Sequence, residues 1–223
     1  MYFDLNIPIN EHLDKNARDK LKLILHRLSQ LDDQVVVALN YTLTKYSSTK
    51  LPDLLAPIEY DNVKILRRIT METDIILEES AWETLQSKYD LVALRTSERN
   101  VFEHACQSKY IDIISLGCAQ RLPFTLDPMM VNLATEHNIY FELEYAPGIR
   151  DNTSRGYVYQ LGHALIACPL SNHLVISSGA EIVSEIRAPF DVYYFAKSFG
   201  LPNDLAKFPF WKNPQSLIAH KLL

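Results

Sequence analysis

Arginines are the residues of this chain whose type and spacing point most directly to chemistry. The stretch from Ile111 to Asp151 contains two short apolar runs, IDIISLG and YFELEYA, and after each run the chain reaches an arginine. The planar guanidinium group donates paired hydrogen bonds to phosphate oxygens. If the two runs are strands of one parallel sheet, Arg121 and Arg150 lie at the same edge of that sheet. This spacing favours a site that binds a phosphate-bearing molecule.

Eight arginines make up the candidate phosphate-binding set. Six of them follow predicted strand ends or lie about one helical turn beyond, and two lie in the alternating run NVKILRRITMETD. The set is Arg67, Arg68, Arg95, Arg99, Arg121, Arg150, Arg155 and Arg187. In a barrel of parallel strands the six would converge on one rim, which favours the binding of a polyanion. Each arginine could instead pair with a carboxylate such as Glu98, Asp151 or Glu185, and the sequence leaves this open.

The other reactive side chains are poorly arranged for catalysis. A metal-dependent hydrolase barrel would place His-x-His at the end of its first strand, where this chain has Asp4-Leu5-Asn6. One carboxylate and one amide, which alternation would put on the same face, are a poor ligand set for zinc or manganese. Glu142 and Glu144 alternate on a later strand and could act as an acid–base pair or hold nearby arginines. The sequence therefore predicts no catalytic residue, no metal and no cofactor.

Composition restricts the class of protein. The chain has 223 residues, of which 48% are hydrophobic, and this is enough for one large core. Its net charge of −5 differs from the basic balance of an autonomous nucleic-acid-binding domain, so polyanion binding would come from a local patch. No run approaches the roughly 20 apolar residues of a membrane span. The first residues lack the basic and apolar regions of a secretory signal. We therefore expect no membrane association.

The pattern of strands and helices predicts how the arginines are positioned. The first elements are expected at residues 1–7 (strand), 17–31 (helix), 34–42 (strand), 43–60 (loop) and 62–74 (strand). Later strands begin near residues 90, 111, 139 and 173, at intervals of roughly one βαβ unit, about 30 residues. Asp127, followed by Pro128, is expected to cap a helix. The chain is therefore predicted to form one α/β domain over residues 1–223, an irregular (β/α) barrel of the TIM type.

Several segments together resemble a known family. MYFDLNIP, DLVALRT, IDIISLG with RLPF, FELEYAPGIRD with Arg155, and VISSGA with APFDV resemble the ribonuclease P/MRP 30-kilodalton protein subunit family, in the family's order. The resemblance covers essentially the whole chain. It implies a barrel related to the polymerase-and-histidinol-phosphatase metallohydrolases but without their metal ligands. It also implies a non-catalytic subunit of an RNA-based endoribonuclease, which removes the 5′ leader from precursor tRNA, while the related MRP particle processes ribosomal RNA.

The resemblance also implies partners and a location. The expected partners are the ribonuclease P RNA and the MRP RNA, a Pop5-like protein subunit, other ribonuclease P/MRP proteins and, through the complex, precursor tRNA. The eukaryotic particles are nuclear and largely nucleolar. The eight arginines would then bind the RNA backbone and help to shape the catalytic RNA. Two alternatives stay open: a metal-dependent barrel phosphatase or phosphodiesterase, and an assembly protein whose arginines form internal salt bridges.

Overall fold

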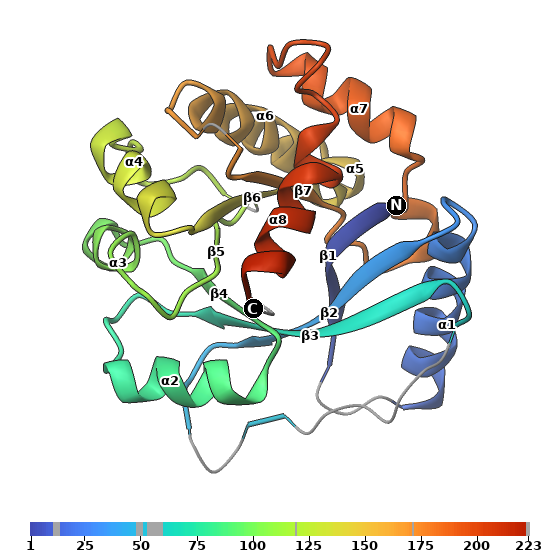
Figure 1. Cartoon of the computed structure of the whole chain (residues 1–223), viewed down its shortest axis with the longest axis horizontal. Coiled ribbons are helices and arrows are strands. Elements are labelled where there is room, and N and C mark those ends of the chain that lie inside the picture. Colours follow the sequence, from blue (N-terminus) through green and yellow to red (C-terminus); the bar gives the residue numbers. More distant parts are fainter. Residues whose placement is uncertain (11–13, 48–50, 53–59, 119, 171, 222–223) are drawn as a thin grey trace.

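Seven short apolar segments form the parallel strands of one sheet that curves into a nearly closed barrel (Figure 1). The computed structural model describes residues 1–10, 14–47, 51–52, 60–118, 120–170 and 172–221. The strands are Tyr2–Ile9 (β1), Val35–Leu43 (β2), Val63–Glu72 (β3), Leu91–Arg95 (β4), Ile113–Ser115 (β5), Tyr140–Glu144 (β6) and Leu174–Ser177 (β7). They pair in chain order, and the Gly179 N–H donates to the Asn6 carbonyl at 3.0 Å across the gap between β7 and β1. The predicted TIM-like fold is confirmed.

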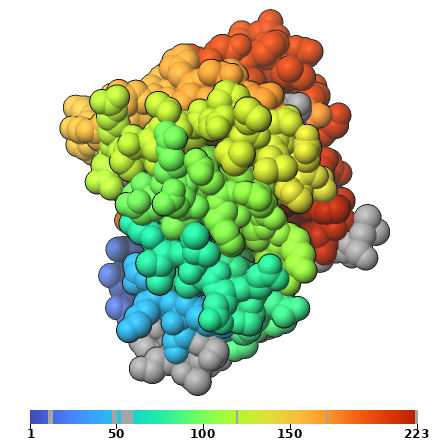
Figure 2. All heavy atoms as spheres, turned by 90° about the vertical axis from the view of Figure 1, so that its left-hand side faces the viewer, coloured from blue at the N-terminus to red at the C-terminus, as the bar shows by residue number. Residues whose placement is uncertain are grey.

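Helices surround the barrel, as the βαβ spacing predicted. They are Lys15–Ser29 (α1), Glu79–Lys88 (α2), Arg99–Ala105 (α3), Pro128–Glu136 (α4), Ala146–Arg150 (α5), Asn152–Ile166 (α6), Pro189–Ser198 (α7) and Lys212–Lys221 (α8), with short 3₁₀ helices at Val183–Glu185 (η1) and Phe208–Phe210 (η2). Figure 2 shows the side on which α2, α3 and α4 form a continuous outer layer. In the described ranges, no helix is long and apolar enough to cross a membrane.

Local sequence signals explain where these helices begin and which face they bury. The Asp127 carboxylate accepts a hydrogen bond from the Met129 N–H at 2.9 Å, so α4 is capped as predicted. On α1, the buried residues recur at helical spacing: Leu21, Ile24, Leu25 and Leu28. Each fully buried leucine or isoleucine contributes about 1.5–3 kcal/mol relative to exposure, which anchors α1 on the sheet.

Helix α8 covers the amino end of the barrel. Its Leu217 packs with Phe3, Leu5 and other inward-facing residues from the first half of each strand. The Asn213 side chain donates to the Leu174 carbonyl at 2.8 Å, and α8 crosses in front of the strands in Figure 1. With this end filled, the carboxyl ends of the strands are where the barrel can hold a cavity.

Three local features differ from the sequence predictions or refine them. The segment after β6 forms the short helix α5, which the sequence analysis did not predict. The pairing of β1 with β2 shifts register between Asp4 and Ile7, and this bulge turns Asn6 into the barrel while Asp4 faces the seam with β7. The expectation that Asp4 and Asn6 share a face was therefore wrong.

In the predicted loop over 43–60, the described residues 44–47 and 51–52 form no helix or strand, and 48–50 and 53–59 lie outside the described part.

Candidate nucleic-acid interface

A cavity of about 1080 Å³ lies at the carboxyl ends of the strands. Three of the predicted arginines, Arg95, Arg121 and Arg150, line it, although they lie on different segments of the chain. Within the described residues, the other charged groups of the lining are five carboxylates: Glu72, Asp74, Glu144, Asp151 and Glu181. The cavity therefore has more negative than positive formal charge. This balance opposes the entry of phosphate groups.

An ion pair between Arg68 and Glu142 fills the barrel interior. Arg68 Nη1 and Nη2 donate to the two carboxylate oxygens of Glu142 at 2.5 and 2.7 Å, and both side chains are 0% exposed. Arg68 Nη1 also donates to the Leu5 carbonyl at 2.8 Å. Burial by itself would raise the pKa of Glu142, but the charge and hydrogen bonds of Arg68 outweigh it and lower that pKa. A guanidinium enclosed in this way cannot reach RNA, so we correct the prediction and remove Arg68 from the candidate contacts.

Arg95 and Arg150 are paired with carboxylates in the wall of the cavity. Arg95 donates to Glu144 through Nη2, and its side chain is 22% exposed. Arg150 donates through Nε and Nη2 to the Glu185 carboxylate at 2.8 and 2.9 Å, and its Nη1 lies 2.8 Å from the carboxylate of Glu181. The hydrogen bond to Glu185 is the largest of the effects that raise the pKa of Arg150. Glu142 and Glu144 thus hold arginines, which is one of the two roles that the sequence allowed.

Asn6 lies in the segment at which the sequence analysis compared Asp4-Leu5-Asn6 with the His-x-His of a metal-dependent hydrolase barrel. Its Nδ2 donates to Glu142 Oε2 at 3.2 Å, the carboxylate oxygen that also accepts from Arg68 Nη2. The guanidinium of Arg68 thus takes the place beside this carboxylate that a cation would need. In the part of the chain that the structure describes, no three His, Cys, Asp or Glu side chains are grouped to hold a metal ion.

Three further arginines lie outside the barrel interior. Arg67 donates through Nε and Nη2 to Asp90 at 2.9 and 2.7 Å, near the amino end of β4, and is 41% exposed. Arg99 is exposed at the start of α3, with Thr125 Oγ1 at 3.4 Å from its Nη2. Arg121 is exposed at the mouth of the cavity and has no ion pair with another described residue. Arg99 and Arg121 thus keep their charge available to a ligand.

Arg155 and Arg187 lie at a second cavity, of about 340 Å³, bounded by α5, α6 and α7. The six arginines expected at one rim are therefore divided between the mouth of the barrel, its flank and the start of α3. The sequence analysis did not predict a binding role for the aromatic side chains of this second cavity, among them Tyr145, Tyr159 and Phe195. The signal was present in the aromatic-rich run DVYYFAKSFG that follows Arg187.

Fold and interior together define the class of protein. It is a TIM-like α/β barrel of seven parallel strands that encloses an arginine–carboxylate pair, with a second such pair at its mouth. The family model described as RNase P subunit p30 matches residues 1–223. The chain belongs to this family of ribonuclease P protein subunits, as its motifs predicted.

Two of three similar proteins are named as ribonuclease P subunits. The chain is 30% identical to ribonuclease P protein subunit p30 of Mus musculus over 164 residues, which are 71% of this chain and 60% of that protein. It is 25% identical to probable ribonuclease P protein subunit 3 of Schizosaccharomyces pombe, over 99% of this chain and 93% of that protein. It is 34% identical to Protein GAMETOPHYTE DEFECTIVE 1 of Arabidopsis thaliana over 60% of this chain, but spans only 23% of that protein.

A solved structure shows the same fold. It is described as the cryo-EM structure of archaeal ribonuclease P with mature tRNA, and one of its chains superposes with a TM-score of 0.69. The match covers 98% of this chain and 90% of that chain at 15% sequence identity. At this identity the likeness concerns the arrangement of strands and helices alone.

Proposed function

We propose that this chain is a non-catalytic protein subunit of ribonuclease P, and also of RNase MRP. It would support removal of the 5′ leader from precursor tRNA, and rRNA processing, by binding and shaping the catalytic RNA. The observation that carries this proposal is the match of the RNase P subunit p30 family over residues 1–223. The proposed partners are the ribonuclease P and MRP RNAs, a Pop5-like protein and other subunits, with precursor tRNA reached through the complex. The proposed location is the nucleus, including the nucleolus.

The RNA contacts in this proposal come from arginines that form no ion pair with a described carboxylate. These are Arg99, Arg121, Arg155 and Arg187, which are exposed or half-buried and have no ion pair with other described residues. Contacts of this kind position an RNA without reading its sequence. Arg67, Arg95 and Arg150 keep partial exposure but are already paired, so we assign them a smaller share of the binding. With few free arginines and a net charge of −5, the isolated subunit is expected to bind RNA weakly.

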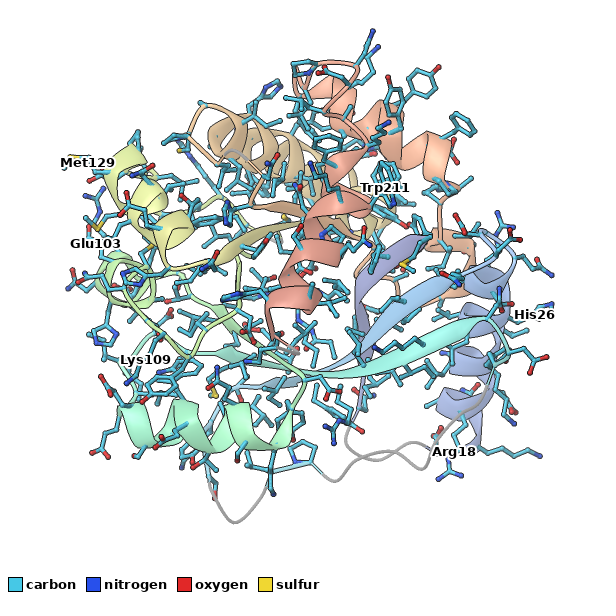
Figure 3. All side chains as sticks on the ribbon, viewed as in Figure 1. Arg18, His26, Glu103, Lys109, Met129 and Trp211 are labelled. Carbon is cyan, nitrogen blue, oxygen red and sulfur yellow. The ribbon has the colours of Figure 1, made fainter. Side chains whose placement is uncertain are left out.

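The experiment that tests this proposal is affinity purification of the chain from its own cells, with sequencing of the RNA that co-purifies. Ribonuclease P RNA and MRP RNA are expected. Arg99→Glu with Arg121→Glu should reduce their recovery, because two free cations become anions near the cavity mouth. The matched control is Arg18→Glu with Arg27→Glu on α1, where Arg18 points away from the barrel (Figure 3).

Three results would count against the proposal or narrow it. Absence of specific RNA, together with a stoichiometric bound metal in the purified protein, would favour a metal-dependent phosphatase or phosphodiesterase. Recovery of ribonuclease P RNA without MRP RNA would restrict the chain to one particle. Full RNA recovery with the Arg99 and Arg121 reversals would move the attachment to protein contacts and favour a pure assembly role.

A further inference from the structure

The second cavity lies on the flank of the barrel, away from the carboxylate-rich mouth. It is about 340 Å³ in volume, and α5, α6 and α7, which bound it, lie next to one another in Figure 1. This volume is at the lower end of the range for small-molecule sites, roughly 300–1,000 Å³. A single nucleotide is of this scale, whereas an RNA duplex is far too wide to enter.

Three aromatic side chains give the cavity its apolar walls. The rings of Tyr145 and Phe195 have centroids 6.2 Å apart at an interplanar angle of 70°, and those of Tyr159 and Phe195 are 6.2 Å apart at 77°. These edge contacts hold the rings in fixed orientations. Tyr159 is 37% exposed, so part of its ring is open to a ligand. Unpaired RNA bases stack on aromatic side chains of this kind.

Two arginines add positive charge beside the aromatic walls. Arg155 Nε donates to the Gly148 carbonyl at 2.8 Å, which orients the guanidinium and leaves its two Nη groups without a partner among the described residues. The side chain of Arg187 is half-buried and likewise has no such partner. The remaining charged residue of the lining is Asp191, whose carboxylate already accepts from the Ala188 N–H at 3.3 Å. The cavity thus has a net positive formal charge, in contrast to the mouth of the barrel.

We propose that this cavity binds one unpaired nucleotide of an RNA, with the base against Tyr159 and Phe195 and the adjoining phosphate on Arg155 and Arg187. The proposal rests on the proposed function, since it names the site at which this subunit would hold its RNA. A positively charged groove combined with aromatic rings is the usual means of binding single-stranded nucleic acid with little sequence preference. The nucleotide would come from a loop, bulge or end, because bases in a duplex are already stacked and paired.

Ultraviolet cross-linking of the affinity-purified particle tests this site. Zero-length cross-links form where a base contacts a side chain, and mass spectrometry of the digested protein locates them. We expect a nucleotide adduct on Phe195 or Tyr159. The change Arg155→Gln with Arg187→Gln should reduce the yield of this adduct by about tenfold or more, the effect of losing charged hydrogen bonds to one phosphate. The matched control, Arg18→Gln with Arg27→Gln on α1, should leave the yield unchanged.

The aromatic wall is tested by a second pair of variants. Tyr159→Ala should weaken RNA binding by the reconstituted particle by about tenfold, the effect of losing one stacked base. Tyr157→Ala, on the same helix but outside the cavity lining, should leave it unchanged. Equal melting temperatures of the variants and the original chain show that the fold is intact.

Each remaining outcome overturns the proposal in a distinguishable way. Recovery of ribonuclease P RNA with adducts only outside this cavity, and neutral Arg155 and Arg187 variants, would disprove the nucleotide site and leave the proposed function intact. Variants that release a protein subunit, without a change in RNA adducts, would show that the cavity binds a protein. Absence of ribonuclease P RNA from the unaltered particle would disprove the proposed function and this site together.

Discussion

The mouth of the barrel and its flank both present arginines, but they differ in the carboxylates around them. At the mouth, Arg95 is paired with Glu144 and Arg150 with Glu185. On the flank, Arg155 and Arg187 have no ion pair with another described residue. The comparison teaches that neither the residue type nor its position after a strand decides the role of an arginine. What decides it is whether a carboxylate lies within ion-pair distance of the guanidinium group.

Solvation explains why the two regions are built differently. A charge inside the barrel loses its hydration, and the loss is compensated only if a partner charge and hydrogen bonds are close by. Arg68 therefore requires Glu142, with which it shares complete burial. On the flank the guanidinium groups of Arg155 and Arg187 keep contact with water and need no internal partner. Such arginines remain available to an external anion.

The contrast between arginines that need an internal partner and those that do not is tested most strongly by breaking the buried pair of Arg68 and Glu142. Arg68→Met leaves the buried Glu142 without its partner and is expected to lower the free energy of unfolding by about 3–5 kcal/mol. The neighbouring change Arg67→Met removes a half-exposed pair with Asp90 and should cost only about 1 kcal/mol or less. Denaturant unfolding of both variants measures the difference.

A double variant shows whether the cost comes from the uncompensated charge. Arg68→Met combined with Glu142→Leu replaces the pair by apolar groups and should recover most of the lost stability. If Arg68→Met alone were as stable as the original chain, the interior would not depend on this pair. The distinction between mouth and flank would then lose its energetic basis.

A second prediction concerns Asp4, the interior carboxylate that has no charged partner among the described residues. Burial is the main cause that raises its pKa from 3.8 to about 6. The folded protein therefore holds this proton more tightly than the unfolded chain, and the free energy of unfolding should fall by about 2 kcal/mol as the pH rises from about 4 to 6. Asp4→Asn should remove most of this fall, as measured by denaturant unfolding at several pH values.

The pKa of Glu142 is shifted in the opposite direction to that of Asp4, and this difference provides an internal check. Because the pKa of Glu142 is lowered, its stabilising contribution is lost only as the pH falls below the usual carboxyl range. The two effects are therefore separated by pH. A pH profile of Asp4→Asn that matched the original chain between pH 4 and 6 would contradict the assignment to Asp4.

A third prediction tests whether a paired arginine contributes to the stability of the fold or to RNA binding. Arg150→Gln removes the hydrogen bonds to Glu185 and the ion pair with Glu181, and should lower the free energy of unfolding by about 1–2 kcal/mol. It should change the salt dependence of RNA binding little, because this charge is already matched. A large loss of RNA affinity with unchanged stability would show that Arg150 serves the RNA instead.

The smallest effect on stability is expected on the flank. Arg155→Gln with Arg187→Gln should lower the free energy of unfolding by about 1 kcal/mol or less, since the change removes no internal ion pair with a described residue and one hydrogen bond, from Arg155 Nε to the Gly148 carbonyl. The same change should reduce the slope of log affinity against log salt concentration by about 0.7 for each single-stranded phosphate released. Binding of the reconstituted particle to ribonuclease P RNA at several salt concentrations measures the slope. An unchanged slope would show that the arginines of the flank contribute no more to RNA binding than the paired arginines of the mouth.

Periodicity and local signals were enough to predict much of the fold. The βαβ spacing of the second half, the first helix, which was expected over residues 17–31, and the Asp127 cap of α4 are all found in the structure. The positions of the arginines after strand ends were also predicted. Local patterns failed where backbone geometry changes without a composition signal, as at the register shift between Asp4 and Ile7 and at α5.

The sequence by itself determined the succession of strands and helices, because burial imposes a period of two on strands and of 3.6 on helices. It also determined that the chain has positive groups where strands end. Only the tertiary structure decided which of these groups are free. Arg68 and Glu142 are 74 residues apart in the chain, and barrel closure brings them into contact. Charge pairing depends on distance in space and on lost hydration, and neither quantity is encoded in the local pattern around an arginine.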